Sequence, residues 1–244
     1  MFRKFARQFA PAIALSAAAF VSACSVDMGM GDFDGVPLAE LDLTAANPDT
    51  IKLAGPDNVV ISEGEQFSVD VTGDQEAVDA LRFALDGDSL GIGRRSGSNV
   101  DGRARIAIVV TSLRTISLAG SGDIEAERLE GDGDINIAGS GTTRIGRIET
   151  DALDISIAGS GDVEGSGTSR SLDVSIAGSG SAKLRGLQVD NADISIAGSG
   201  DLEFSSDGTV DASIIGSGDV TVRGSAECSV SAVGSGKLRC GPAS

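Results

Sequence analysis

The sequence contains no histidine, tryptophan or tyrosine, and its aromatic residues are limited to eight phenylalanines among 244 residues. The absence of histidine excludes Ser-His-Asp hydrolysis, Cys-His catalysis and the usual zinc sites. The absence of tryptophan and tyrosine removes the side chains that most often anchor tight interfaces or stack against sugars. These absences argue against an enzymatic active site and against a deep, aromatic-lined binding pocket.

Basic residues are also scarce, at 19 Lys and Arg against 36 Asp and Glu, for a formal net charge of -17. Three of the basic residues (Arg3, Lys4 and Arg7) precede residue 24, so the remainder holds 16 basic and 36 acidic residues, or -20. Such a surface repels phosphate backbones, and we expect no nucleic-acid partner. With 41 % hydrophobic residues, the chain still has enough apolar side chains to fold.

Residues 1–23 have the features of an export signal. The basic start is followed by an apolar stretch over residues 9–21, roughly 13 residues, which is too short to span a bilayer. The following Val21-Ser22-Ala23-Cys24 resembles the lipobox of bacterial lipoproteins, which implies cleavage before Cys24 and lipidation of Cys24. Ordinary signal-peptidase cleavage after Ala23 is the alternative.

The cysteine count favours lipidation. The chain has three cysteines, Cys24, Cys228 and Cys240, and ordinary export would leave one of them unpaired in an oxidising compartment. Lipidation of Cys24 leaves an even pair, and we predict a Cys228–Cys240 disulfide that closes the C-terminal end. Ser25 follows Cys24 and favours the outer membrane, so we expect a lipoprotein on its periplasmic side or on the surface of a Gram-negative cell.

The second half of the chain is a repeat. Gly-Ser-Gly recurs every 18 to 20 residues, beginning at Gly120, Gly139, Gly159, Gly178, Gly198, Gly216 and Gly234. Before each copy, apolar residues alternate with one small polar residue, as in Ile155-Ser156-Ile157, which is typical of a strand with one buried face. A further Gly-Ser-Gly at Gly165 is out of phase and predicts a loop.

One strip of this kind cannot bury its apolar face alone, but stacked strips form a continuous core. We therefore predict an all-β chain: a right-handed parallel β-helix, or β-solenoid, with repeats of about 19 residues and coils about 4.8 Å apart. A flat antiparallel meander is the alternative. The predicted segments are a tether over 24–50, a smaller irregular β region over 51–112, and the repeat solenoid over 113–244. The irregular region is either the first coils of the solenoid or a small packed β-domain, with a helical turn near 75–80.

These patterns resemble a known family, the auto-transporter adhesin head GIN domain of Gram-negative lipoproteins. The resemblance rests on the repeated Ile-Ala-Gly-Ser-Gly units, the opening Phe33-Asp34-Gly35 and the run from Ile51 to Val71, and it covers about 33–240. It implies a β-helix-like fold and an extracytoplasmic location, and it carries no catalytic residues to transfer.

Aspartates form two columns of the repeat. One lies three residues after the first corner glycine, at Asp123, Asp162, Asp201 and Asp219; the other lies five before it, at Asp134, Asp154, Asp173, Asp193 and Asp211. Like charges stacked one coil apart are destabilising unless solvent or cations screen them. The second column is a candidate Ca²⁺ site. The favoured interpretation is solvated and turn aspartates that cap corner amides, with no metal and no cofactor.

An enzyme is not expected, because the aspartates repeat evenly instead of clustering, and because the arginines considered as catalytic helpers lie outside the regular repeats, at Arg94, Arg95, Arg103, Arg105 and Arg114. We predict a non-catalytic, lipid-anchored cell-envelope solenoid for adhesion or interaction. Its expected partners are the membrane through its lipid and an envelope polymer, glycan or protein. The alternative is a periplasmic ligand- or Ca²⁺-binding lipoprotein, and a polysaccharide-active β-helix enzyme is a remote one.

Overall fold

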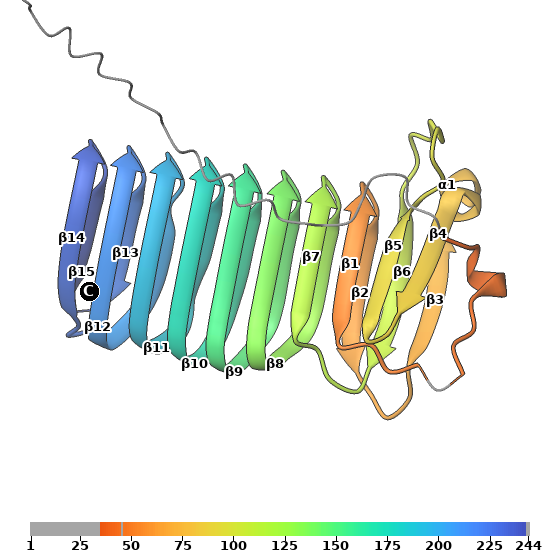
Figure 1. Cartoon of the computed structure of the whole chain (residues 1–244), viewed down its shortest axis with the longest axis horizontal. Helices are drawn as coiled ribbons and strands as arrows, with labels where there is room; N and C mark the ends of the chain where they lie inside the picture. Colours follow the sequence, from red (N-terminus) through yellow and green to blue (C-terminus); the bar gives the residue numbers. More distant parts are fainter. Residues whose placement is uncertain (1–34, 45, 243–244) are drawn as a thin grey trace, which may run out of the picture.

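The computed structural model describes residues 35–44 and 46–242, so the leader, Cys24 and Phe33-Asp34 lie outside the described residues. The chain forms a β-solenoid in which flattened coils stack along one axis (Figure 1). This confirms the predicted all-β solenoid. Each regular coil is one long strand; these are β8 (Asp123–Gly139), β9 (Thr142–Gly159), β10 (Asp162–Gly178), β11 (Ser181–Gly198) and β12 (Leu202–Gly216).

Two sheets form the two sides of the solenoid, and each long strand bends from one into the other. We call the sheet whose strands lead into the Gly-Ser-Gly corners the pre-corner sheet, and the sheet whose strands follow the corners the post-corner sheet. Regular coils pair in parallel with equivalent residues side by side, such as Ile157 with Ile176 and Ile176 with Ile196. Each column of the sequence repeat therefore becomes a row of side chains along the solenoid.

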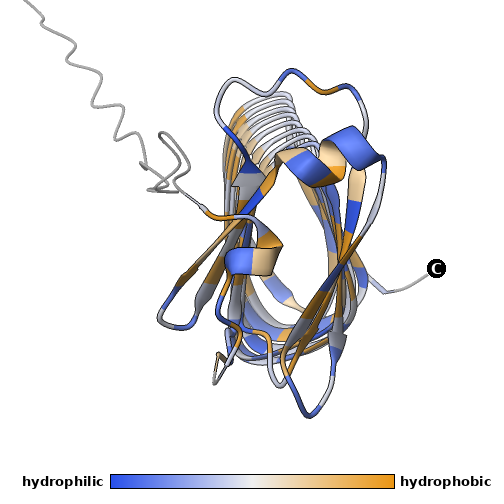
Figure 2. Cartoon of the chain, turned by 90° about the vertical axis from the view of Figure 1, so that its right-hand side faces the viewer, coloured by the Kyte–Doolittle hydropathy of each residue, from blue (hydrophilic) through white to orange (hydrophobic). Residues whose placement is uncertain are grey.

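The inward rows fill the space between the sheets. Ile157 and Ile176 each expose 2 % of their surface, and one cluster of buried side chains runs from Ile51 to Val222. Viewed along the axis, the coils enclose the space between the two sheets, and hydrophobic residues recur along both sides (Figure 2). Burial of these rows stabilises the stack, because each inward aliphatic side chain contributes about 1.5–3 kcal/mol when it leaves water.

The Gly-Ser-Gly corners bring neighbouring coils into close contact. At Gly178, φ is +132°, and a Cβ atom there would overlap the carbonyl oxygen of Gly159. The amide of Ser179 donates to that same carbonyl, at 2.8 Å. Glycine is required because only it combines this backbone conformation with this approach.

The opposite edge of the coils has no fixed corner sequence, and the long strands bend there at irregularities of pairing. The out-of-phase Gly165-Ser166-Gly167 lies at such a bend inside β10, where the register shifts against both neighbouring strands. The loop predicted at this point is wrong. Gly167, with φ of +140°, lets the strand turn while it stays paired.

The N-terminal coils stack in an order that differs from their order in the chain. The first coil consists of β1 (Thr50–Gly55) and β2 (Asn58–Glu63), and a later coil consists of β5 (Ser89–Arg94) and β6 (Ala104–Val110). β1 pairs in parallel with β5 on one side and with β7 (Thr115–Gly120) on the other. The first coil therefore lies between two coils that come later in the chain.

A cap covers the N-terminal end. β3 (Ser68–Gly73) pairs antiparallel with β6, and β4 (Leu81–Asp86) pairs antiparallel with β5. Between them lies α1 (Gln75–Ala80), the predicted helical turn, which begins at the capping side chain of Asp74 and buries Ala77 and Ala80. The short 3₁₀ helix η1 (Leu38–Glu40) and α1 lie across the end of the stack (Figure 2).

A buried ion pair holds the segment that joins β5 to β6. Asp57, fully buried in the Gly55-Pro56-Asp57 corner, accepts from the Arg94 guanidinium at 2.8 and 2.7 Å and from the Ala104 amide at 2.8 Å. Arg94 also donates to the carbonyl of Val100, at 2.7 Å. The Asp57 hydrogen bond raises the pKa of Arg94. Both charges are satisfied inside this network, which indicates a structural role.

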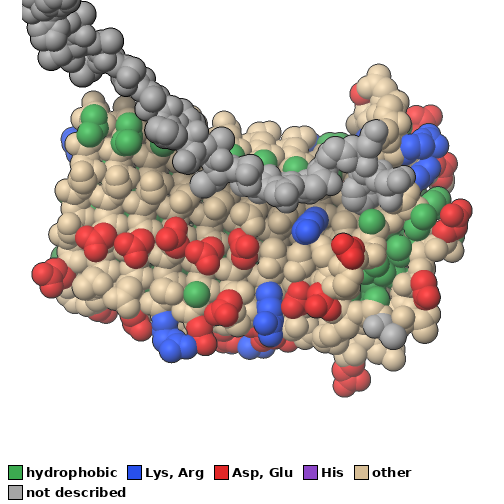
Figure 3. All heavy atoms as spheres, in the orientation of Figure 1, with side chains coloured by type: hydrophobic (Ala, Val, Ile, Leu, Met, Phe, Trp, Pro, Cys, Tyr) green, Lys and Arg blue, Asp and Glu red, His purple; other side chains and the backbone are tan. Residues whose placement is uncertain are grey.

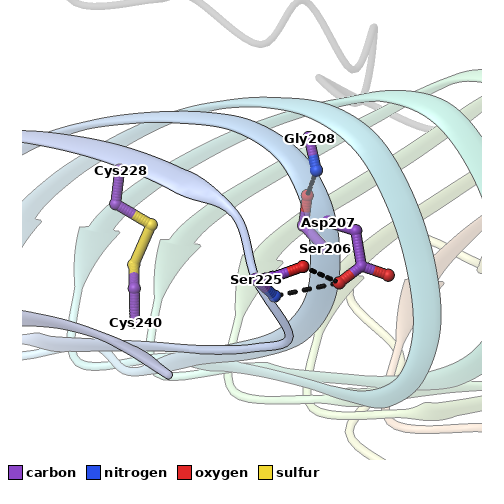
Figure 4. Close-up of a disulfide and its surroundings, with 6 residues drawn as sticks. All are labelled: Ser206, Asp207, Gly208, Ser225, Cys228 and Cys240. Carbon is purple, nitrogen blue, oxygen red and sulfur yellow. Dashed lines mark hydrogen bonds between the residues drawn. A yellow bond between two sulfur atoms is a disulfide. The ribbon is translucent and has the colours of Figure 1, made fainter. Parts of the chain in front are cut away.

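The C-terminal end is formed by β13 (Asp219–Arg223) and β14 (Glu227–Gly234), which make the last full coil, and by β15 (Lys237–Gly241), which stacks on β13. A disulfide joins Cys228 on β14 to Cys240 on β15, with Cα atoms 6.7 Å apart (Figure 4). Next to it, the Asp207 carboxylate accepts from the amide and the hydroxyl of Ser225, at 2.9 and 2.8 Å. These hydrogen bonds lower the pKa of Asp207.

Candidate functional site

The outer surface of the pre-corner sheet carries an acidic row. The five aspartates of the second column lie in register on adjacent strands from β8 to β12; they are Asp134, Asp154, Asp173, Asp193 and Asp211. Neighbouring strands lie about 4.8 Å apart. Figure 3 shows a straight row of acidic side chains along this face. We call this surface, together with the rows beside it, the acidic face.

Small side chains lie beside the acidic row. A serine row in register next to it consists of Ser117, Asn136, Ser156, Ser175, Ser195, Ser213 and Ser231. A third row is alanine from β7 to β11, ending at Ala197. An open hollow of about 460 Å³ lies along the serine and aspartate rows from β10 to β14. The surface is therefore broad and shallow, without a deep pocket.

The charges of the acidic row are not neutralised by cations of the chain. Among the described residues, none of the five aspartates takes part in an ion pair, and Asp134 accepts one hydrogen bond, from the Asn136 amide at 2.8 Å. Burial raises the pKa of Asp134, and Asp154 raises it further. Burial also raises the pKa of Asp173, with contributions from Asp154 and Asp193. The row is a repulsive arrangement that fits a positively charged or hydrogen-bonding ligand.

The predicted metal ligands lie in one row, with one carboxylate on each coil. Over residues 35–44 and 46–242, no group of three or more Asp, Glu or Cys side chains has the geometry of a metal site. Ca²⁺ prefers six to eight oxygen ligands, so a cation here would depend on adjacent carboxylates, serine oxygens and water. Ca²⁺ binding by this row stays a prediction.

Three of the four aspartates in the other column have a structural role. The carboxylate of Asp162 accepts from the Ser181 amide at 3.1 Å, that of Asp201 from the Asp219 amide at 2.9 Å, and that of Asp219 from the Lys237 amide at 3.0 Å. Each of these aspartates caps the first amide of the next coil, as the favoured interpretation expected.

The outer surface of the post-corner sheet carries charges of alternating sign. In register from β8 to β15, its central row reads Glu125, Arg144, Glu164, Lys183, Glu203, Thr221 and Arg239. Glu164 lies 3.2 Å from Arg144 and 3.4 Å from Lys183. We call this surface the alternating face. Most of the charged side chains exposed on this face take part in ion pairs.

This second row was missed from the sequence, although its signal is visible there. The arginines considered in the sequence were those outside the repeats, but Arg144, Lys183 and Arg239 lie inside them, on the sheet opposite the acidic row. Aligning the residues five positions after each corner glycine reveals the alternation. The repeats therefore contain cations, and these cations are far from the acidic row because they face the other way.

The described residues include two of the three predicted cysteine sites. It holds a disulfide between Cys228 and Cys240, whereas Cys24 lies outside the described residues. No helix among residues 35–44 and 46–242 is long and apolar enough to cross a bilayer.

Comparison with known families assigns this chain to one of them. The stacked coils and glycine corners define a β-solenoid, and the model of the family described as "Putative auto-transporter adhesin, head GIN domain" matches residues 47–226. The chain belongs to this family. The match confirms the resemblance drawn from the Gly-Ser-Gly units. A search of curated proteins found no match.

Solved structures share the fold. A "putative adhesin" from Bacteroides fragilis is 23 % identical, with a TM-score of 0.75 over 80 % of this chain and 92 % of that one. A "putative lipid binding protein" from Parabacteroides distasonis is 26 % identical, with a TM-score of 0.61 over 80 % of this chain and 93 % of that one. A "putative adhesin" from Parabacteroides merdae is 20 % identical, with a TM-score of 0.61 over 80 % and 92 %. The family and two of these three structures are described as adhesins, the third is described as lipid-binding, and none of these descriptions names an enzyme.

Proposed function

We propose that this chain is a non-catalytic, lipid-anchored solenoid of the cell envelope, and that it mediates adhesion through its acidic face. The observation that carries the proposal is the row of five aspartates in register, none of which is in an ion pair among the described residues, next to an uninterrupted row of small polar side chains. Membership of an adhesin-head family and the adhesin descriptions of the structural neighbours support it.

The rows indicate the chemistry of the partner. Carboxylates accept strong hydrogen bonds, and serine hydroxyls both donate and accept them. A surface that carries unpaired negative charge repels anionic polymers. We therefore propose a neutral, hydroxyl-rich envelope glycan as the partner class. Equivalent groups repeat at each coil, so many weak contacts would act together, and avidity would exceed the affinity of any single contact.

A cation-dependent role is the second candidate, and the unpaired carboxylates in register favour it, because a bridging cation would relieve the repulsion between neighbouring aspartates. It corresponds to the periplasmic ligand- or Ca²⁺-binding alternative. The lipid-binding description of one neighbour adds lipid as a ligand class to be tested. A polysaccharide-active enzyme is disfavoured by the even spacing of the aspartates, which concentrates no carboxylate pair at one coil.

The test is binding to purified envelope glycans, measured with the unlipidated chain in the presence of Ca²⁺ and in the presence of a chelator. A variant with Asp173→Asn, Asp193→Asn and Asp211→Asn should lose at least tenfold in apparent affinity. The matched control removes three charges from the alternating face, as Glu125→Gln, Glu164→Gln and Glu203→Gln, and should bind within about twofold of the original chain.

The outcomes separate the candidates. Equal loss in both triple variants would contradict a role for the acidic face and indicate a net-charge effect. Binding that vanishes with the chelator and is unaffected by glycan class would favour the cation-binding candidate. Binding to lipid vesicles without glycan binding would favour the lipid ligand.

Lipid anchoring has its own test, since Cys24 lies outside the described residues. Cys24→Ser should move the protein from the membrane fraction to the soluble envelope fraction. Intact mass of the purified natural protein is the direct measurement, and a mature chain without added acyl mass would contradict the anchor.

A further inference from the structure

The C-terminal end of the solenoid, in contrast to the N-terminal end, is not covered by the described chain. β14 pairs with β12, and β15 pairs with β13; within residues 35–44 and 46–242 neither strand has a partner on its outer side. Two adjacent strand edges are therefore open. Unpaired edges are rare on long flat strands, because they invite pairing with another chain.

The inward residues of the last coil are also uncovered. Val230 exposes 51 % of its surface, whereas its counterparts in the same row, such as Ile155, Val174 and Ala212, expose between 0 and 5 %. Ala232, in the other inward row of β14, is exposed as well. The end of the core is thus an apolar surface that the described residues leave uncovered.

The outer rows change composition at this end. The alanine row of the acidic face becomes Ile215 and then Val233, which are 60 % and 68 % exposed. These residues continue the apolar end of the core around the edge of the last coil. Exposed apolar residues that gather at one place are typical of an interaction site.

The charge at this end suits association of identical chains. The acidic row stops at Asp211, and Ser229 occupies its position on β14; Lys237 occupies the position held by Asp219 one coil earlier. Residues 224–242 contain one acid, Glu227, and two bases, Lys237 and Arg239, which gives 2 − 1 = +1 in a chain of -17. Two copies repel each other least where they meet through this coil.

We propose that two copies of this chain join through their C-terminal ends. A two-fold axis perpendicular to the sheets would place β14 antiparallel to its symmetry mate and β15 antiparallel to its own, so both sheets and the core would continue through the interface. Such an interface is isologous and closes after two copies. The cap of β3, α1 and β4 prevents growth from the other end.

The size of this end is sufficient for a specific but moderate interface. A strand of eight residues such as β14 is about 26 Å long, and two sheets about 10 Å apart with their side chains are about 20 Å deep. The end therefore presents about 500 Å² per copy in projection, near the lower limit for specific interfaces. We expect a dissociation constant in the micromolar range.

The experiment is sedimentation velocity of the exported chain with Cys24→Ser, from about 1 to about 100 μM, a range that brackets such a constant. The original chain should change from monomer to dimer with concentration. Val233→Lys, on the outer surface of β14, and Val230→Lys, at the end of the core, should each weaken the dimer at least tenfold. Ala197→Lys is the matched control: it makes the same charge change in the same row as Val233, two coils away from the end, and should leave the dimer unchanged.

Thermal unfolding at low concentration is the control for folding. Because Val233→Lys changes an exposed side chain, the variant should unfold at the same temperature as the original chain. A chain that stays monomeric at all concentrations would overturn the proposal. A dimer that survives Val233→Lys, or one that Ala197→Lys weakens equally, would also overturn it, as would open-ended filaments.

Discussion

On the alternating face, Glu164 lies between Arg144 and Lys183, whereas on the acidic face Asp173 lies between Asp154 and Asp193. Both rows are built by the same strands and the same coil spacing. The alternating row repeats every two coils, and the acidic row repeats every coil. Since the chain places opposite charges in register on one face, the unpaired row on the other does not follow from the fold alone, and we attribute it to binding.

The largest expected effect comes from disrupting the hydrophobic core that lies between the two faces and supports both of them. Ile157→Asp places a carboxylate in the inward row between them, where the side chain is 2 % exposed. We expect a loss above about 4 kcal/mol, because the charge has no partner there. Denaturant unfolding measures it; a variant that folds with a loss under about 1 kcal/mol would contradict the buried inward row.

The disulfide is a covalent cross-link between the two sheets that carry these faces, since Cys228 lies on the pre-corner sheet and Cys240 on the post-corner sheet. The double variant Cys228→Ser and Cys240→Ser should lose about 3 kcal/mol, less any strain, because the loop closed by the bond no longer restricts the unfolded chain. Thiol labelling of the denatured, unreduced protein checks the bond itself. Two reactive thiols besides Cys24 would show that the pair is reduced.

Charge reversal distinguishes the faces directly. Arg144→Glu puts three acids in a row on the alternating face and should cost about 1 kcal/mol, since it loses two attractive neighbours and gains two repulsive ones. Asp173→Lys makes the opposite exchange on the acidic face and should stabilise by a similar amount. Equal and opposite shifts in the denaturation midpoint are expected at low salt, and both should shrink as salt is added.

A milder substitution tests the repulsion alone. Asp154→Asn removes one charge from between Asp134 and Asp173, so stability should rise by less than about 1 kcal/mol. Ca²⁺ at millimolar concentration should leave the melting temperature nearly unchanged if the row binds no metal. A rise of about ten degrees, which corresponds to several kcal/mol in a domain of this size, would favour the metal interpretation.

The smallest expected effect is a difference in pH dependence. The pKa values of Asp134 and Asp173 are raised above the ordinary 3.8, so the folded state holds their protons more tightly and their contribution to stability falls as pH rises above that value. The pKa of Asp219 is lowered, chiefly by its hydrogen bond from Arg239, so its contribution is lost as pH falls below 3.8. The denaturation midpoint should depend less on pH above 3.8 in the double variant Asp134→Asn and Asp173→Asn. In Asp219→Asn it should depend less on pH below 3.8.

Much of this architecture follows from periodicity. The alternation around Ser156 and the glycines at Gly159 and Gly178 predict inward rows and corners because every repeat makes the same contacts. The position of β1 between β5 and β7 was not predicted, since it depends on pairing between segments without a common sequence pattern. The Asp57–Arg94 pair was equally hidden, because its partners lie 37 residues apart and outside the repeat.

The order of the N-terminal coils has a consequence for how the chain acquires its structure. In the regular part, each coil can add to the one before it as the chain emerges. The β1–β2 coil cannot complete in this way, because both of its neighbours, β5–β6 and β7–β8, are formed by residues that follow it, as far as Ala126. About half of the chain must therefore be available before the N-terminal end closes, and its closure joins segments that are far apart in the sequence, which costs more loop entropy than adding one regular coil.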